Sequence, residues 1–139
     1  MEASIKSAHD GTELVFSQVR TSPDGELDSF VVGVRSANLK CSAKVYGYMS
    51  DGLPAYFSEL DNLMNNFGGW EGARTWSSLE GELEISASAD SLGHVTTKVK
   101  LRSGHYELDW TAEAGLLLEA GQLSRVAKDV GNVFASGAA

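Results

Sequence analysis

The sequence predicts an α+β protein built in two layers, with an antiparallel sheet of about six strands and two helices packed on one face of that sheet. Two observations lead to this fold class. Segments in which apolar and polar residues alternate, as in half-buried strands, occur in two groups of three. Each group is followed by a segment with apolar residues at helical spacing, so the expected order is βββαβββα. With 139 residues, the chain is expected to form a single domain, 1–139.

The first half is expected to contain three strands, over about 14–19, 30–35 and 39–49. A polar segment precedes them and predicts a flexible tail over residues 1–11. The inward face of the first strand stays open. Its four apolar residues offer two competing faces, namely Leu14 with Phe16, or Val15 with Val19.

Tyr46 and Tyr48 alternate with the inward-facing residues of the third strand, so both are expected on its solvent face. Exposed tyrosines on a sheet suit protein recognition. The first helix follows, beginning near Pro54, whose missing N–H costs nothing in a first turn, and ending at Gly68. Its apolar seam comprises Tyr56, Phe57, Leu60, Leu63, Met64 and Phe67.

A hairpin with strands over 79–89 and 94–102 is the clearest local signal in the chain. Its turn ends on Gly93, which suits the left-handed position of a three-residue loop and pairs Asp90 with His94. Counting back from that pair gives the register, with Ser88 opposite Thr96, Ser86 opposite Lys98, Glu84 opposite Lys100, and Glu82 opposite Arg102. The charged pairs are expected on the solvent face, where they disfavour a slipped register.

The second half is expected to end with a sixth strand over about 106–118, in which Trp110 faces inward, and a helix over about 121–134. Residues 135–139 should fray. Each half therefore contains three strands and a helix, which allows a structural pseudo-repeat.

Two tryptophans flank the loop between the first helix and the hairpin. Trp70 and Trp76 either close one end of the core or present an exposed anchor to a partner. Arg74, between them, is expected to stack on either ring or to pair with Glu71.

The net charge of −8 argues against nucleic acid or an anionic membrane as the partner, because those contacts need clustered Lys and Arg. A basic partner suits this charge. The single cysteine, Cys41, has no partner for an intramolecular disulfide, and the sequence shows neither a secretory leader nor an apolar run that would span a bilayer. A cytoplasmic location is expected.

No residue pattern in the chain specifies a reaction. Glu80, Glu82 and Glu84 share one strand face, but acid–base catalysis needs a buried carboxyl group, and a solvated face opposite lysines does not offer one. The three histidines are scattered, and no G-x-S-x-G motif or phosphate-binding glycine loop is present. We therefore expect a protein that is not an enzyme and that binds no metal or other cofactor.

Part of the sequence resembles a known family of small, acidic, uncharacterised actinobacterial proteins. The resemblance covers about the last two-thirds of the chain and rests on Gly69-Trp70-Glu71-Gly72, Trp76-Ser77-Ser78-Leu79-Glu80-Gly81 and Gly93-His94-Val95. It implies no catalytic residues. In size, acidity and lack of a reactive site, the chain is also similar to immunity proteins that neutralise toxins delivered between bacteria.

The leading hypothesis is therefore a protein-binding module, most concretely an immunity protein that occludes a basic toxin and is itself a monomer or homodimer. Its expected partner-binding residues are Tyr46, Tyr48, Trp70, Glu71, Arg74, Trp76, Glu80, Glu82 and Glu84. The alternative is a small-ligand-binding or regulatory domain, with a pocket between the first helix and the sheet. Tyr56, Met64 and Trp70 would line that pocket.

Overall fold

The computed structural model describes residues 1–48, 50, 52–104 and 109–137. Its elements are β1 (Glu2–Lys6), β2 (Glu13–Thr21), β3 (Leu27–Arg35), β4 (Lys40–Tyr46), α1 (Leu53–Phe67), β5 (Arg74–Ser77), β6 (Leu83–Ala89), β7 (Val95–Arg102), β8 (Thr111–Leu118) and α2 (Gln122–Ala135). Four strands and a helix thus occur twice. The α+β class is confirmed, and each half contains one more strand than the sequence predicted.

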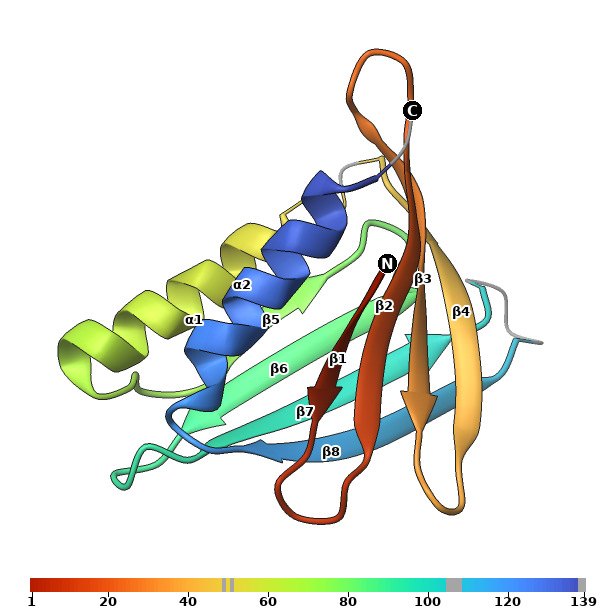
Figure 1. The fold of residues 1–139 in the computed structure, drawn as a ribbon. Coiled ribbons are helices and arrows are strands. Elements are labelled where there is room, and N and C mark those ends of the chain that lie inside the picture. Colours follow the sequence, from red (N-terminus) through yellow and green to blue (C-terminus); the bar gives the residue numbers. More distant parts are fainter. Residues whose placement is uncertain (49, 51, 105–108, 138–139) are drawn as a thin grey trace.

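The strands form two antiparallel sheets rather than one. Sheet A has the order β1-β2-β3-β4 and sheet B the order β5-β6-β7-β8 (Figure 1). The prediction of a single sheet of about six strands is therefore wrong. Alternation shows which face of a strand is apolar, but it does not specify which strands are neighbours. Here each half closes its own meander, and both apolar faces share one core with both helices.

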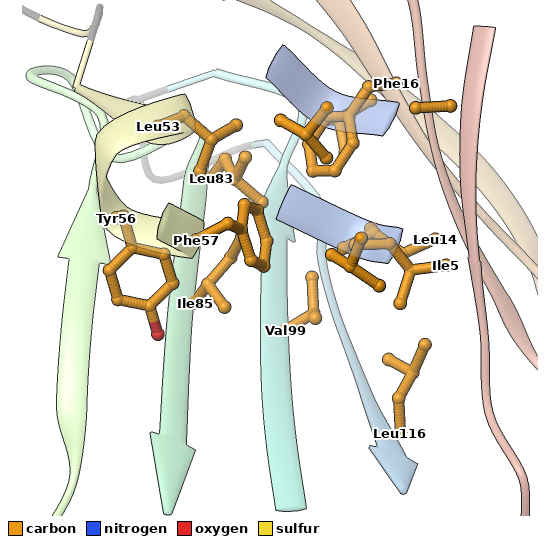
Figure 2. Close-up of a cluster of buried hydrophobic side chains, with 14 of the residues drawn as sticks. Ile5, Leu14, Phe16, Leu53, Tyr56, Phe57, Leu83, Ile85, Val99 and Leu116 are labelled. Carbon is orange, nitrogen blue, oxygen red and sulfur yellow. The ribbon is translucent and has the colours of Figure 1, made fainter. Parts of the chain in front are cut away.

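Phe16 of β2 lies near the centre of this shared core. Its ring centroid lies 6.2 Å from that of Phe30, 6.3 Å from that of Phe57 and 6.2 Å from that of Phe134. These neighbours come from β3, α1 and α2, so one side chain contacts three elements. Figure 2 shows the residues around it, with side chains from α1, sheet B and the first two strands pointing toward one another.

The N-terminal segment is a strand, not a tail. Ala3 and Ile5 are buried, and β1 pairs with β2 along its whole length. The prediction of a flexible segment over residues 1–11 is therefore wrong for residues 2–6. Two inward apolar residues were too weak a signal for a strand. At the other end, Thr21 Oγ1 donates a hydrogen bond to the carbonyl of Gly137 (3.1 Å), while residues 138–139 lie outside the described part of the chain.

A bulge in β2 explains the competing faces of that strand. Gln18 has a φ of 51°, and the pairing with β3 shifts between Ser17 and Arg20. An extra residue reverses the alternation beyond it, so Phe16 and Val19 both become buried although their spacing is odd.

Both helices form where the sequence predicted them. α1 has Pro54 in its first turn and ends on Gly68 in the left-handed region, as expected. Phe67 was predicted on the apolar seam, but it is 78% exposed in the last turn of the helix, beyond the reach of the core. The two helices lie side by side (Figure 1).

The register of the central hairpin is confirmed. Ser88 pairs with Thr96, Ser86 with Lys98 and Glu84 with Lys100, and the N–H of Asp90 donates to the carbonyl of His94 (3.0 Å). The strand begins at Leu83, however, rather than at residue 79. Gly81, with a φ of 77°, turns the chain between 78 and 82, and the preceding Leu79 is exposed.

The start of the last strand differs in the same way. β8 begins at Thr111, and the preceding Trp110 is 42% exposed although it was predicted to face inward. The predicted start of this strand, over residues 106–108, lies outside the described part of the chain.

Candidate partner-binding site

Two distant segments that carry exposed side chains meet where sheet A approaches sheet B. The hydroxyl of Ser50 accepts a hydrogen bond from the N–H of Leu79 (3.0 Å) and donates one to the carbonyl of Tyr48 (3.3 Å). Tyr46 is 57% exposed, Tyr48 76% and Leu79 54%, and Glu80 beside them is also exposed. We call these four residues, Tyr46, Tyr48, Leu79 and Glu80, the junction patch.

Glu82 joins the two segments from below the surface. This residue is only 3% exposed. One carboxylate oxygen accepts a hydrogen bond from the hydroxyl of Ser78 (2.7 Å), and the other accepts one from the N–H of Tyr46 (3.1 Å). The hydroxyl of Ser78 also accepts from the N–H of Leu83 (3.1 Å). The carbonyl of Glu82 accepts a hydrogen bond from the N–H of Arg102 (2.9 Å), so the predicted pairing of these two residues is confirmed. The prediction that the Glu82 side chain faces solvent is wrong, because the carboxylate is buried and bonded to Ser78 and Tyr46.

Close backbone packing further restricts the end of β4. A Cβ atom at Gly47 would lie 2.1 Å from the carbonyl oxygen of Leu27, so only glycine fits there. The ammonium of Lys44 lies 5.5 Å from the centroid of the Tyr46 ring, within cation–π range. Tyr46 is thus the last residue of a constrained strand. The strand predicted over 39–49 ends there, and Tyr48 lies in the turn that follows.

The two loop tryptophans pack against the core instead of joining the junction patch. Trp70 is half-buried, and its indole N–H donates to the carbonyl of Ala87 (3.0 Å). Trp76 is also half-buried and packs against the core, and its indole nitrogen lies near Gly52 at the start of α1. These contacts favour the core-closing alternative for both rings. Their predicted role in partner binding stays a prediction.

The charged residues of this loop lie on the surface beside α1. Arg74 forms an ion pair with Glu59 (2.6 Å), rather than the pair with Glu71 that the sequence suggested. Glu71 is exposed. An exposed pair of this kind contributes about 0 to 1 kcal/mol, so it indicates no special chemistry.

Glu84 lies on the outer face of sheet B. It is opposite Lys100, which is in turn opposite Glu113 on β8. These three residues border a hollow of about 380 Å³ whose other lining residues include Lys98 and Gly115. The expected partner-binding residues are therefore divided between the junction patch, the loop beside α1 and this outer face.

The residues expected to line a ligand pocket are engaged in packing. Tyr56 donates its hydroxyl to the carbonyl of Arg74 (2.8 Å). Burial, with a smaller contribution from the nearby Glu59 carboxylate, raises the pKa of Tyr56 well above its usual range. Since the polar groups of Tyr56 and Trp70 both bond to backbone carbonyls, they are not directed toward a ligand.

Within the described residues, no three His, Cys, Asp or Glu side chains gather in a way that would hold a metal ion. His94, at the hairpin turn, contacts Asp90 (3.1 Å) and Glu119 (3.4 Å) through its two ring nitrogens. A backbone hydrogen bond from His94 lowers the pKa of Asp90, and further bonds from Leu92 and the imidazole add to this effect. No helix in the described part of the chain has the length and apolarity needed to cross a bilayer.

Sequence reasoning missed Leu79, Ser50 and the inward turn of Glu82. The available signal was the segment Ser78-Leu79-Glu80-Gly81, which has the residues of a turn but was treated as the start of a strand.

Comparison with known proteins gives a family but no activity. A search of curated proteins and a search of solved structures each found no match. The model of a family described as a family of unknown function, DUF6228, matches residues 5–137, which is nearly the whole chain. The chain therefore belongs to the DUF6228 family.

Proposed function

We propose that the protein is a cytoplasmic binding module for a basic protein partner, most concretely an immunity protein that neutralises a cognate toxin by occlusion. The observation that carries this proposal is the junction patch, in which two tyrosines and a leucine are exposed on two segments that are hydrogen-bonded to each other. Tyrosine is enriched among the residues that dominate binding energy at interfaces.

The contacts that hold the junction patch in place support the same function. Glu82 and Ser50 hold its two segments together, and Gly47 packs tightly against Leu27. A surface that is ordered before binding loses less conformational entropy when a partner docks. The net charge of −8 would increase the rate of encounter with a basic partner, and Glu80 places part of that charge in the patch.

The proposal can be tested by co-expressing the protein with the product of the adjacent gene and measuring both complex formation and rescue of growth. We expect Tyr48→Ala to weaken the complex about thirtyfold, the effect of losing a residue that contributes about 2 kcal/mol at an interface. Phe67→Ala is the matched control, because Phe67 is similarly exposed at the end of α1 and lies outside the patch. Absence of a complex, or equal effects of both changes, would reject the proposal.

Replacing a glutamate with lysine on each of the two acidic surfaces tests which surface binds the partner. Glu80→Lys changes the junction patch, whereas Glu84→Lys changes the outer face of sheet B. We expect Glu80→Lys to slow association and to reduce its salt dependence, with a smaller effect of Glu84→Lys. The opposite ranking would move the proposed interface to the outer face.

A further inference from the structure

The two open sheets have four edge strands, and these edges are protected to different degrees. α2 packs along β1, and Gln122 Nε2 donates to the carbonyl of Lys6 (3.0 Å). β5 has only four residues. β4 presents Lys40 and Lys44, and its last N–H is bonded to Glu82. Lysines and short strands are common means of preventing an edge from pairing with another chain. β8 has neither.

The hydrogen bonds of Leu117 show which backbone groups of β8 point away from β7. Its N–H donates to Ser7 Oγ (3.0 Å) and its carbonyl accepts from the N–H of Ala8 (2.8 Å). The β7–β8 register runs without a shift from Leu118 to Thr111. The alternating residues Thr111, Glu113 and Gly115 therefore direct their N–H and C=O groups outward as well. All three are exposed, and no hydrogen bond to these backbone groups comes from the described residues.

We propose that this edge accepts an extended segment of a partner protein as a fifth, antiparallel strand of sheet B. The segment carries an acidic, an apolar and a basic residue in succession. This inference goes beyond the junction patch and does not depend on it, because it concerns another surface and a different mode of recognition.

On the outer face of sheet B, side chains that lie opposite one another on β6, β7 and β8 form rows across the strands, which we call charge rows. These rows specify the outer side chains of the added strand. One row runs from Glu84 through Lys100 to Glu113, so its next member should be basic. The neighbouring row runs from Ser86 through Lys98 to Gly115.

Gly115 leaves space for an acidic side chain in that second row. A Cβ built on it meets no atom within 4 Å, and the hollow of about 380 Å³ lies over it. An acidic side chain opposite Gly115 can reach across this space toward Lys98. On the other face, half-buried Ala112 and Ala114 suit apolar neighbours. An antiparallel segment meets position 115 before 113, which sets the order acidic, apolar, basic.

A second copy of the chain fits this edge less well. Ser7 and Ala8 occupy the edge at Leu117, which leaves residues 111–115 for pairing. If two copies paired through this edge around a two-fold axis, and both used Thr111, Glu113 and Gly115, then Glu113 of one copy would lie directly opposite Glu113 of the other. Like charges in that position are destabilising.

The probe is the capped peptide Gly-Glu-Val-Lys-Val-Thr-Gly, and its control is Gly-Lys-Val-Glu-Val-Thr-Gly, which has the same composition with the charges exchanged. Titration is followed by amide NMR signals and hydrogen exchange of the full chain. We expect the first peptide to shift and protect the amides of Thr111, Glu113 and Gly115, and to bind about tenfold more tightly than the control.

Two variants test the charge rows. Glu113→Lys should abolish or reverse the preference between the peptides. Gly115→Val should occupy the part of the hollow directly over position 115 and weaken binding of the first peptide. It should leave the fold intact, since its side chain meets open space. Neither change alters the junction patch. Loss of peptide binding at the edge of β8 can therefore be distinguished from loss of partner binding at the junction patch. No response at these amides at millimolar peptide, equal binding of both peptides, or a concentration-dependent dimer that protects the same amides would overturn the inference.

Discussion

Replacing Glu82 with alanine should destabilise the protein far more than replacing an exposed glutamate of the same sheet. The carboxylate of Glu82 is the acceptor for Ser78 Oγ and for the N–H of Tyr46, which belongs to a segment 36 residues away. Glu82→Ala removes both hydrogen bonds and leaves a void at the contact between the sheets. Glu84→Ala is the matched control, because Glu84 is exposed and faces Lys100 across the ladder.

The expected magnitude follows from the two partners. A hydrogen bond to a charged group contributes roughly 1.5 to 3 kcal/mol. The hydroxyl of Ser78 is buried and would lose its acceptor, whereas Tyr46 is exposed enough for water to replace part of its bond. We therefore expect a loss of about 2 to 4 kcal/mol for Glu82→Ala, against about 0 to 1 kcal/mol for Glu84→Ala.

Glu82→Gln refines this prediction. The amide oxygen can accept from the N–H of Tyr46, and the amide nitrogen can donate to the Ser78 hydroxyl, which has a second lone pair available. The loss should then be only about 1 kcal/mol.

The free energy of unfolding of all three variants is measured by urea unfolding at pH 7. The comparison requires that the m-value is the same in each variant. Hydrogen exchange at the Tyr46 amide should accelerate in Glu82→Ala but not in Glu84→Ala. If Glu82→Ala costs no more than Glu84→Ala, the buried carboxylate does not hold the two sheets together and the reasoning is refuted.

Three further changes test other parts of the structure. Gly47→Ala would force a Cβ to within 2.1 Å of the Leu27 carbonyl oxygen, so it should cost more than about 3 kcal/mol or prevent folding, as judged by thermal unfolding. Tyr56→Phe removes a hydrogen bond to a β5 carbonyl and should cost about 1 kcal/mol in urea, and equal stability would contradict this bond. The pKa of Asp90 is lowered in the folded state, mainly by the hydrogen bond from the backbone N–H of His94. Ionised Asp90 therefore stabilises the folded protein at pH values above its ordinary pKa of 3.8, and this stabilisation is lost as the pH falls through the lower pKa of the folded state. Asp90→Asn should therefore lower the melting temperature at pH 7, with the difference narrowing in acid, and a difference that is independent of pH would contradict the assignment.

The central hairpin was predictable in detail because its determinants are local. Gly93 specifies the turn, and the alternation on either side specifies the register, so the pairing of Glu84 with Lys100 follows from about twenty consecutive residues. The same local logic correctly predicted both ends of α1 from Pro54 and Gly68. Local patterns gave the wrong prediction at Gly81, where a turn interrupts an alternation that otherwise predicts one continuous strand.

The sequence by itself determined the α+β class, both helices, the hairpin register and the exposure of Tyr46 and Tyr48. Each of these depends on spacing and turn residues within a short stretch of chain. Only the tertiary structure decided that there are two sheets, that Glu82 is buried beneath the junction patch, and that the edge of β8 is covered at Leu117 but exposed at Thr111, Glu113 and Gly115. These features depend on which distant segments meet, and alternation of apolar residues carries no information about the neighbour of an edge strand.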